Sequence, residues 1–187
     1  MSKNIEIEVK SLIDEKSYLS LIKGKEDKCY VQYNYYIDTP SFSLHEQKIG
    51  LRIRYKNNTY ELTLKLRLNE GKLEINQDIN ERDFNSFRND SVFPNGEVKT
   101  KLEELGFNVN QLRIFVLLKT TRLDVNYKTS LISIDKSEFN GITDYEVECE
   151  DSSMQSAKKN LIDYLKENEV PYQENFVSKL RRAKDSL

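Results

Sequence analysis

Several segments of this chain alternate charged and aliphatic residues with a period of two. In the run 5–10, Glu6, Glu8 and Lys10 alternate with aliphatic residues, and the run 144–150 repeats the pattern. Because successive side chains of a β-strand point to opposite faces, each run predicts a strand with one charged and one aliphatic face. A single strand of this kind usually turns its charged face to water. The recurrence of the pattern favours charged faces that meet inside an enclosed space.

The sign of the charge differs from strand to strand. The run 51–55 carries Arg52 and Arg54, and the run 60–68 places Lys65 on the face opposite its leucines. An asparagine-containing turn between the two runs predicts a hairpin that brings these basic residues onto one sheet face. Carboxylates on some strands and guanidiniums on others suit a lumen that holds metal ions together with a polyanion, because buried like charges are very costly unless a counter-ion neutralises them.

Composition excludes several classes of function. The 187 residues fit a single domain, 1–187, and the formal net charge of −2 argues against a general nucleic-acid binder. Cys29 and Cys149 lie far apart, with no pattern that supports a disulfide framework or a zinc site. The single histidine, His45, is expected at the surface, so catalysis by an imidazole group is not favoured. No apolar run suits a signal peptide or a membrane span, and we therefore expect a cytoplasmic protein that binds neither nucleic acid nor membrane.

Local signals predict an α+β fold built on a large antiparallel sheet. Strand signals fall at 5–10, 31–37, 51–55, 60–68, 73–80, 112–127, 131–136 and 143–150. Helix signals fall after Asp14, around 84–87, at 97–105, after Ser152 or Ser153, and at 175–183. Because no strand-helix-strand alternation is present, we expect antiparallel strands. A closed barrel explains how polar faces lie inside while helices cover the aliphatic outer faces.

The charged faces offer five carboxylates and six basic side chains. Carboxylate oxygens are the ligands that Mg²⁺ and Mn²⁺ prefer, and the candidates are Glu6, Glu8, Asp135, Glu146 and Glu148. Arginine and lysine bind phosphate through charge-assisted hydrogen bonds, and the candidates are Lys10, Arg52, Arg54, Lys65, Arg122 and Lys179. A metal ion with a cationic clamp is the common equipment of phosphoryl transfer.

Eight short motifs follow one another along the chain. They are Glu6-x-Glu8-x-Lys10, Tyr36-Ile37-Asp38-Thr39-Pro40, Leu51-Arg52-Ile53-Arg54, Thr63-Leu64-Lys65, Lys119-Thr120-Thr121-Arg122, Ile134-Asp135, Glu146-Val147-Glu148 and Ser178-Lys179. The first motif alone has little specificity, but the ordered set spans nearly the whole chain. In this order the motifs resemble the CYTH superfamily, also called the triphosphate tunnel metalloenzymes.

The resemblance implies an eight-stranded antiparallel β-barrel tunnel with flanking helices, whose lumen binds a triphosphate and one or two divalent cations. It implies that the five carboxylates face Mg²⁺ or Mn²⁺ and that the six basic residues bind the phosphates. We assign Lys10, Glu6 and Glu8 to catalysis, as aids to a water nucleophile. Glu74 matches an acidic position of many members, but the stretch around it is less acidic here than is usual.

The resemblance leaves the substrate open, because relatives hydrolyse inorganic, thiamine or nucleoside triphosphates and some cyclise ATP. The chain has no tryptophan, the strongest stacking residue, and this favours a substrate without an organic group. Our prediction is therefore hydrolysis of inorganic triphosphate to pyrophosphate and phosphate. The alternatives are an adenylate cyclase, a thiamine or nucleoside triphosphatase, and a non-catalytic module that binds polyphosphate or nucleotides. A homodimer through the aliphatic outer faces is left open.

Overall fold

The computed structural model describes residues 2–69 and 71–187 of the chain. The described residues form two compact units. The first unit holds residues 2–5, 33–69 and 71–118, and the second holds residues 6–32 and 119–187. The units are therefore interleaved along the sequence.

Nine strands run through the described residues. They are β1 (Ser2–Glu6), β2 (Glu8–Ile13), β3 (Tyr30–Asp38), β4 (Gly50–Lys56), β5 (Thr59–Arg67), β6 (Lys72–Ile79), β7 (Arg113–Tyr127), β8 (Ser130–Phe139) and β9 (Ile142–Glu150). Their hydrogen-bonded order is β1-β6-β5-β4-β3-β7-β8-β9-β2. This order begins and ends on strands that Ile7 alone separates, which is the connectivity of the predicted antiparallel barrel. The α+β class is confirmed, with nine strands in place of eight because the two halves of the first predicted strand pair with different neighbours.

The five predicted helices are present, but the last one starts later than predicted and α2 (Ser43–Glu46) was not predicted. The helices are α1 (Glu15–Ile22), α2, α3 (Glu81–Asp90), α4 (Glu97–Glu104), α5 (Met154–Glu167) and α6 (Lys179–Asp185), with 3-10 turns η1 (Glu26–Lys28) and η2 (Val109–Gln111). The prediction of a helix from residue 175 is wrong. Asn175 Oδ1 accepts the backbone N–H of Val177 (2.9 Å), which forms a turn, and the helix starts only after Ser178 caps it.

In the first unit, the core lies between the aliphatic faces of the strands and helices α3 and α4. Asn57 and Asn58 adopt left-handed φ angles of 50° and 61°, as the two-residue turn of the β4–β5 hairpin requires. The fully buried residues include Leu51, Ile53, Leu62, Leu64, Val98 and Leu102. The aliphatic face of the hairpin is therefore the inner face of a core, and its basic face is the opposite one.

His45 belongs to this first unit. It was expected at the surface but is half-buried in α2, because its backbone N–H donates to Asp38 Oδ2 (3.0 Å) and its neighbour Leu44 is fully buried. The carboxylate of Asp38 caps this short helix, so the position of His45 is explained by the packing and capping of α2.

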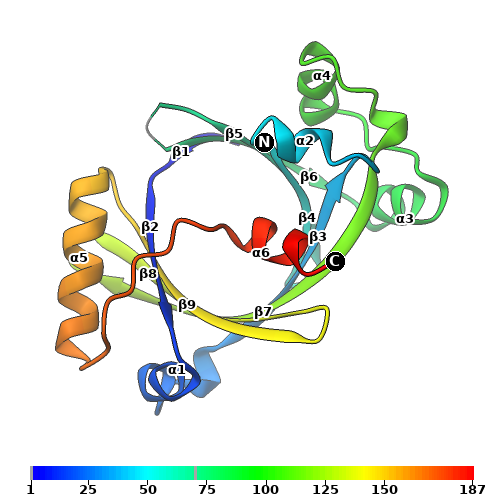
Figure 1. Ribbon diagram of the computed structural model, residues 1–187. Helices are drawn as coiled ribbons and strands as arrows, with labels where there is room; N and C mark the ends of the chain where they lie inside the picture. The colour runs from blue at the N-terminus through cyan, green and yellow to red at the C-terminus, as the bar shows by residue number, and fades with distance from the viewer. Residues whose placement is uncertain (1, 70) are drawn as a thin grey trace. The chain divides into compact units, whose positions relative to one another are not determined.

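In the second unit, helices α1 and α5 cover the aliphatic face of the sheet formed by β2, β8 and β9 (Figure 1). Asp14 and Ser153 cap the two helices through hydrogen bonds to the backbone N–H groups of Ser17 and Ser156. The buried core includes Val9, Ile132, Ile134, Val147, Leu161 and Leu165. Since Val9, Ile132, Ile134 and Val147 alternate with polar residues along their strands, the predicted separation of an aliphatic and a polar face is confirmed for this unit.

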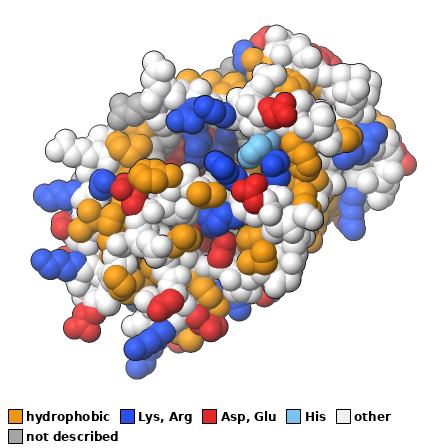
Figure 2. Space-filling view, in the orientation of Figure 1, with side chains coloured by type: hydrophobic (Ala, Val, Ile, Leu, Met, Phe, Trp, Pro, Cys, Tyr) orange, Lys and Arg blue, Asp and Glu red, His pale blue; other side chains and the backbone are white. Residues whose placement is uncertain are grey.

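The surface carries charges of both signs. On the face shown in Figure 2, lysine and arginine side chains lie among acidic and apolar ones. Within residues 2–69 and 71–187, no helix has the length and apolar character that a membrane crossing requires. Cys29 and Cys149 are both free thiols.

Candidate functional site

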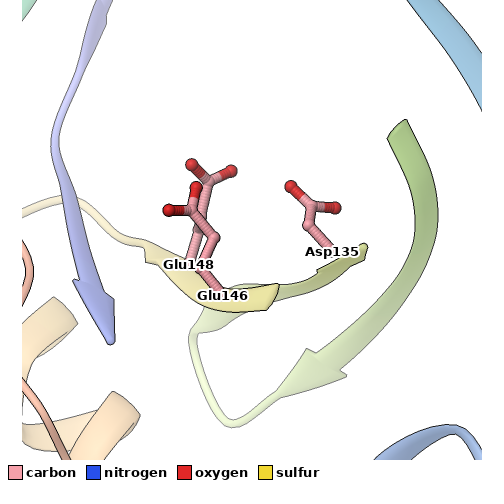
Figure 3. A group of neighbouring side chains, drawn as sticks. All are labelled: Asp135, Glu146 and Glu148. Atoms are coloured by element: carbon pink, nitrogen blue, oxygen red, sulfur yellow. The ribbon is translucent and has the colours of Figure 1, made fainter. Parts of the chain in front are cut away.

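Three carboxylates of the second unit form one group. Asp135 on β8 lies directly opposite Glu146 on β9, and Glu148 follows on the same face of β9. One oxygen from each residue lies within 4.8 Å of the other two. Figure 3 shows the three carboxyl groups rising from adjacent strands toward one common space. The side chains of Asp135 and Glu146 are 0% exposed and that of Glu148 is 13% exposed, so the group is buried.

Four cations contact these carboxylates, namely Arg122, Lys10, Lys179 and Arg182. Arg122 on β7 donates two hydrogen bonds to Asp135, from Nε (2.7 Å) and Nη2 (2.5 Å), and Nη2 also contacts Glu148 (2.6 Å). Lys10 Nζ lies 2.5 Å from Glu148. Lys179 Nζ contacts all three carboxylates, at 2.8 Å from Asp135 Oδ2, at 2.9 Å from Glu148 Oε1, and most closely at Glu146 Oε1.

The ion pairs determine the protonation states of the group. Burial alone would raise the pKa of Glu148, but Lys10, Lys179 and Arg122 together hold that pKa well below its usual range. Burial likewise opposes ionisation of Asp135, whose pKa is lowered by Arg122 and Lys179. The pKa of Lys10 is raised well above its ordinary value despite burial, chiefly by Glu148 and Glu8. Asp135 and Glu148 are therefore ionised and Lys10 is protonated at neutral pH.

Two residues that the sequence analysis missed hold Glu146 in place. Asn175 Nδ2 donates to Glu146 Oε2 (3.2 Å), and Arg182 Nη2 donates to the same oxygen (2.7 Å). Arg182 Nε also donates to Asp144 Oδ2 (2.7 Å). These contacts occupy Oε2 and leave Oε1 directed at the common space. The only sequence signal for Arg182 is its place in a basic C-terminal segment.

A second polar network adjoins the group at Glu148. Tyr30 Oη donates to Asp124 Oδ2 (2.6 Å) and Ser133 Oγ donates to Asp124 Oδ1 (2.8 Å). Ser133 lies directly opposite Glu148 in the β8–β9 register. Burial and the hydrogen bond to Asp124 raise the pKa of Tyr30, so the phenol stays neutral and acts as a donor.

Two buried hydroxyls of the same face have unused hydrogen-bonding capacity. Thr120 and Ser137 face each other in the β7–β8 register, next to the row that contains Arg122 and Asp135, and both are 0% exposed. Neither hydroxyl oxygen has a hydrogen-bond partner among the described residues. Buried hydroxyls normally find a partner, so this pair is suited to a ligand or an ordered water.

The predicted metal ligands do not all meet. The three-acid group of the described residues contains Asp135, Glu146 and Glu148 but neither Glu6 nor Glu8. Glu8 Oε1 lies 3.2 Å from Lys10 Nζ, at the margin of the group. Glu6 is half-buried at the last position of β1. The roles assigned to Glu6 and Glu8 stay predictions.

The predicted basic residues of the first unit lie together on the polar face of its sheet. Arg52 lies opposite Thr63, and Arg54 lies opposite Glu61 and donates from Nε to Asn34 Oδ1 (3.0 Å). Arg52 Nε is buried and has no hydrogen-bond partner among the residues that the structure describes. A buried guanidinium N–H without an acceptor is a position where an anion can bind with little rearrangement.

Lys65 and Glu74 form an ion pair across β5 and β6 in the first unit. Burial opposes ionisation of Glu74, but Lys65 and then Arg52 lower its pKa. Glu74 therefore neutralises part of the basic face. This contact places Glu74 beside predicted phosphate ligands of the first unit.

The three-acid group fits a hard divalent cation. All of its donors are carboxylate oxygens, which Mg²⁺ and Mn²⁺ prefer, and they approach within the span of one coordination sphere. The ammonium of Lys179 lies against all three residues, which shows that the common space accepts a cation. Mg²⁺ commonly completes its sphere with waters and phosphate oxygens, so three protein ligands suffice.

Comparisons with known proteins show which family the chain belongs to. The model of the CYTH domain family matches residues 4–183. A protein of Bacillus subtilis (strain 168) named "Putative triphosphatase YjbK" is 34% identical over 178 residues, which cover 93% of this chain and 92% of that protein.

Solved structures extend the comparison to the fold. A Bacillus halodurans protein described as a "putative adenylate cyclase" has 32% identity and a TM-score of 0.90, with 97% of this chain and 98% of that chain covered. A Hippeastrum protein described as a "putative adenylyl cyclase" with a dominant triphosphatase activity shares the fold, at 23% identity and a TM-score of 0.76 over 97% of this chain and 96% of that one. The match over nearly its whole length, together with these relatives, shows that the chain belongs to the CYTH family.

Proposed function

We propose that this chain is a divalent-metal-dependent triphosphatase that hydrolyses inorganic triphosphate to pyrophosphate and phosphate. The observation that carries the proposal is the buried group of Asp135, Glu146 and Glu148, which is contacted by four cations. A site with clustered carboxylates and clustered cations is equipped for both a metal ion and a polyanion. The relative named as a triphosphatase, at 34% identity, supports the same activity.

Asp135, Glu146 and Glu148 are the residues that would hold Mg²⁺ or Mn²⁺. Such an ion, when bound, supplies positive charge against the phosphate oxygens and so lowers the barrier to nucleophilic attack. Arg182 and Asn175 orient Glu146, and Arg122 orients Asp135. Oriented ligands need little reorganisation when a ligand arrives.

The basic residues bind and position the phosphates. Arg122, Lys10 and Lys179 supply positive charge in the second unit. Arg52, Arg54 and Lys65 supply it in the first, where Arg52 Nε has a free donor. The buried hydroxyls of Thr120 and Ser137 add hydrogen-bonding capacity that no residue described in the structure uses. Lysine acts on phosphate as a point charge, while arginine can donate two parallel hydrogen bonds.

In the proposed reaction a water oxygen bonds to the terminal phosphorus while the bridging P–O bond breaks. The electron pair of that bond leaves with pyrophosphate, and the water proton passes to a carboxylate. Glu8 and Glu6 are the carboxylates that we assign to this step, since Glu8 adjoins Lys10 at the margin of the three-acid group. Hydrolysis then requires positioning and charge, which the site supplies.

Cyclisation of ATP is the second candidate, and the 32% identity to the protein described as an adenylate cyclase favours it. Hydrolysis of thiamine or nucleoside triphosphates and binding without turnover are further alternatives. Cyclisation requires that adenosine be held with its 3′-hydroxyl in line with the α-phosphorus. No adenine-reading motif is evident in the sequence, so we place hydrolysis first.

A substrate panel tests the proposal. Purified protein is incubated with inorganic triphosphate, ATP or thiamine triphosphate, with Mg²⁺, with Mn²⁺ or with excess chelator, and phosphate, pyrophosphate and cyclic AMP are quantified. We expect the highest kcat/KM for inorganic triphosphate, loss of activity in chelator, and ADP rather than cyclic AMP from ATP. Cyclic AMP as the main product of ATP, at higher efficiency than triphosphate cleavage, would establish the cyclase. No turnover of any substrate would leave a binding module. The cytoplasmic location and the homodimer stay predictions.

A further inference from the structure

One ammonium group lies where a divalent cation would bind. Lys179 Nζ contacts Asp135 Oδ2 (2.8 Å) and Glu148 Oε1 (2.9 Å), and it contacts Glu146 Oε1 at still shorter range. Among the described residues, Lys10 forms an ion pair with Glu148 alone of the three acids, Arg182 with Glu146 alone, and Arg122 with Asp135 and Glu148. Lys179 is thus the cation that spans the whole group.

Lys179 follows a short segment, residues 173–175, that is hydrogen-bonded to β2. The backbone around β2 holds the segment through hydrogen bonds from Leu12 N to Gln173 O and from Asn175 N to Lys10 O, both 3.0 Å long. Beyond Lys179, Arg182 binds Asp144 and Glu146. A tethered ligand acts at high effective concentration, on the order of millimolar for short linkers, so this ammonium competes strongly with ions in solution.

A divalent cation and Lys179 cannot share the common space. All three contacts use oxygens of the acids that would bind the metal, and like charges at contact distance repel strongly in a buried site. Lys10 and Arg122 already supply positive charge to Glu148 and Asp135. A metal ion that entered alone would therefore have to displace this ammonium from all three carboxylates at once.

A triphosphate supplies that second partner. It carries several negative charges, and lysine binds phosphate oxygens as readily as it binds carboxylates. If the ammonium moves to a phosphate oxygen, the three carboxylates become available to the metal and the total charge stays balanced. We propose that Lys179 is a built-in competitor of the divalent cation, so that the protein binds the cation weakly alone and tightly together with a triphosphate. This proposal rests on the proposed function and specifies the order in which its ligands bind.

Direct binding measurements test the competition. Mn²⁺ affinity is measured by electron paramagnetic resonance, without triphosphate and with a non-hydrolysable imido analogue of it. The Lys179→Met variant keeps the length of the side chain and removes the charge. We expect it to bind Mn²⁺ alone about tenfold or more tightly than the wild type, and to lose most of the further gain that the analogue gives the wild type. Lys179→Arg should keep weak Mn²⁺ binding, since the cation remains.

Two control variants distinguish competition between Lys179 and the metal ion from a general effect of removing one positive charge. Lys10→Met removes the same charge beside Glu148 without vacating the space between the three acids, so its gain in Mn²⁺ affinity should be clearly smaller. Lys158→Met removes a half-exposed lysine that pairs with Glu174, and should change nothing. Unchanged or weaker Mn²⁺ binding by Lys179→Met, or an equal gain in Lys10→Met, would overturn the proposal. Because Mn²⁺ binding alone requires no turnover, this result is independent of whether the substrate panel shows hydrolysis.

Discussion

The two units carry charge on their sheets in different ways. In the second unit, the three carboxylates Asp135, Glu146 and Glu148 are paired with cations of the same unit. In the first unit, Glu74 pairs with Lys65, but Arg52 Nε is buried without a hydrogen-bond partner among the described residues. One unit therefore satisfies its charges internally, and the other keeps an unused donor.

The difference shows what each unit demands of a ligand. A buried N–H without an acceptor costs about 1–3 kcal/mol, and an anion that accepts its hydrogen bond recovers that cost. A paired group has no such cost, so a metal ion must first displace an existing ion pair. The first unit is thus prepared for an anion, whereas the second needs an exchange of partners before a cation binds. Both features belong to the ligand-free protein and can be tested separately.

The largest effect should come from Glu148→Gln. Glu148 contacts Lys10, Arg122 and Lys179 and is a predicted metal ligand, so the amide removes one ligand charge and weakens three ion pairs. We expect metal-dependent kcat to fall by about 100-fold or more, the range seen when one strong electrostatic contact is lost from an active site. Steady-state kinetics across a Mn²⁺ titration measures this effect.

The matched control is Glu150→Gln, at the exposed end of the same strand. It removes an equal charge outside the three-acid group and should retain wild-type kinetics. Equal kinetics for Glu148→Gln and wild type would place the acids outside the reaction. A fall of similar size in both variants would instead point to a general effect of net charge.

Arg52→Ala should have a smaller effect and should act on binding. A hydrogen bond to a charged group contributes about 1.5–3 kcal/mol, which corresponds to a rise in KM of about tenfold to a hundredfold. Since Arg52 Nε has no hydrogen-bond partner among the described residues, the substitution should lower the melting temperature without ligand far less than Glu148→Gln does. Kinetics and thermal unfolding are measured on the same samples.

Arg67→Ala provides the control, because Arg67 lies at the exposed end of β5. It should leave KM unchanged. If Arg52→Ala destabilised the ligand-free protein as strongly as Glu148→Gln, the contrast between an unused donor and a paired carboxylate would be wrong.

The alternation of residues along each strand was enough to predict which side chains share a face. Contacts between residues far apart in the sequence could not be predicted in this way. Asp135, Glu146 and Glu148 could be named because the period of two places them on one polar face, and the family resemblance supports this. The contacts of Asn175 and Arg182 with Glu146 depend on where the C-terminal segment crosses β2, which no local signal determines.

The break at Ile7 has a similar origin. The alternation of residues 5–10 continues through it without interruption, and the strand divides because its two halves pair with different strands. The late start of α6 also follows from tertiary contacts, since residues 174 and 175 are engaged by β2 and Glu146 before the helix begins. Period and propensity describe a segment alone, whereas these features are set by its neighbours in space.

The smallest effect concerns stability at acidic pH. Burial opposes ionisation of Glu148, but Lys10, Lys179 and Arg122 hold the pKa of its carboxyl well below the ordinary 4.5. A lowered pKa means that the folded carboxylate binds its proton less readily than the unfolded one. Its contribution to stability is therefore complete above pH 4.5 and is lost as the pH falls through the lowered value.

The raised pKa of Lys10 affects stability at alkaline pH. The contribution of Lys10 to stability is complete below pH 10.5 and is lost as the pH rises through the raised pKa. We expect the free energy of unfolding in urea to be nearly constant between about pH 5 and pH 10 and to fall on both sides. Glu148→Gln should flatten the acid side of this profile. Glu74→Gln should flatten it less, since the pKa of Glu74 is lowered mainly by one ion pair with Lys65 rather than by three cations. Equal flattening in the two variants would show that the units do not differ in how strongly they pair their charges.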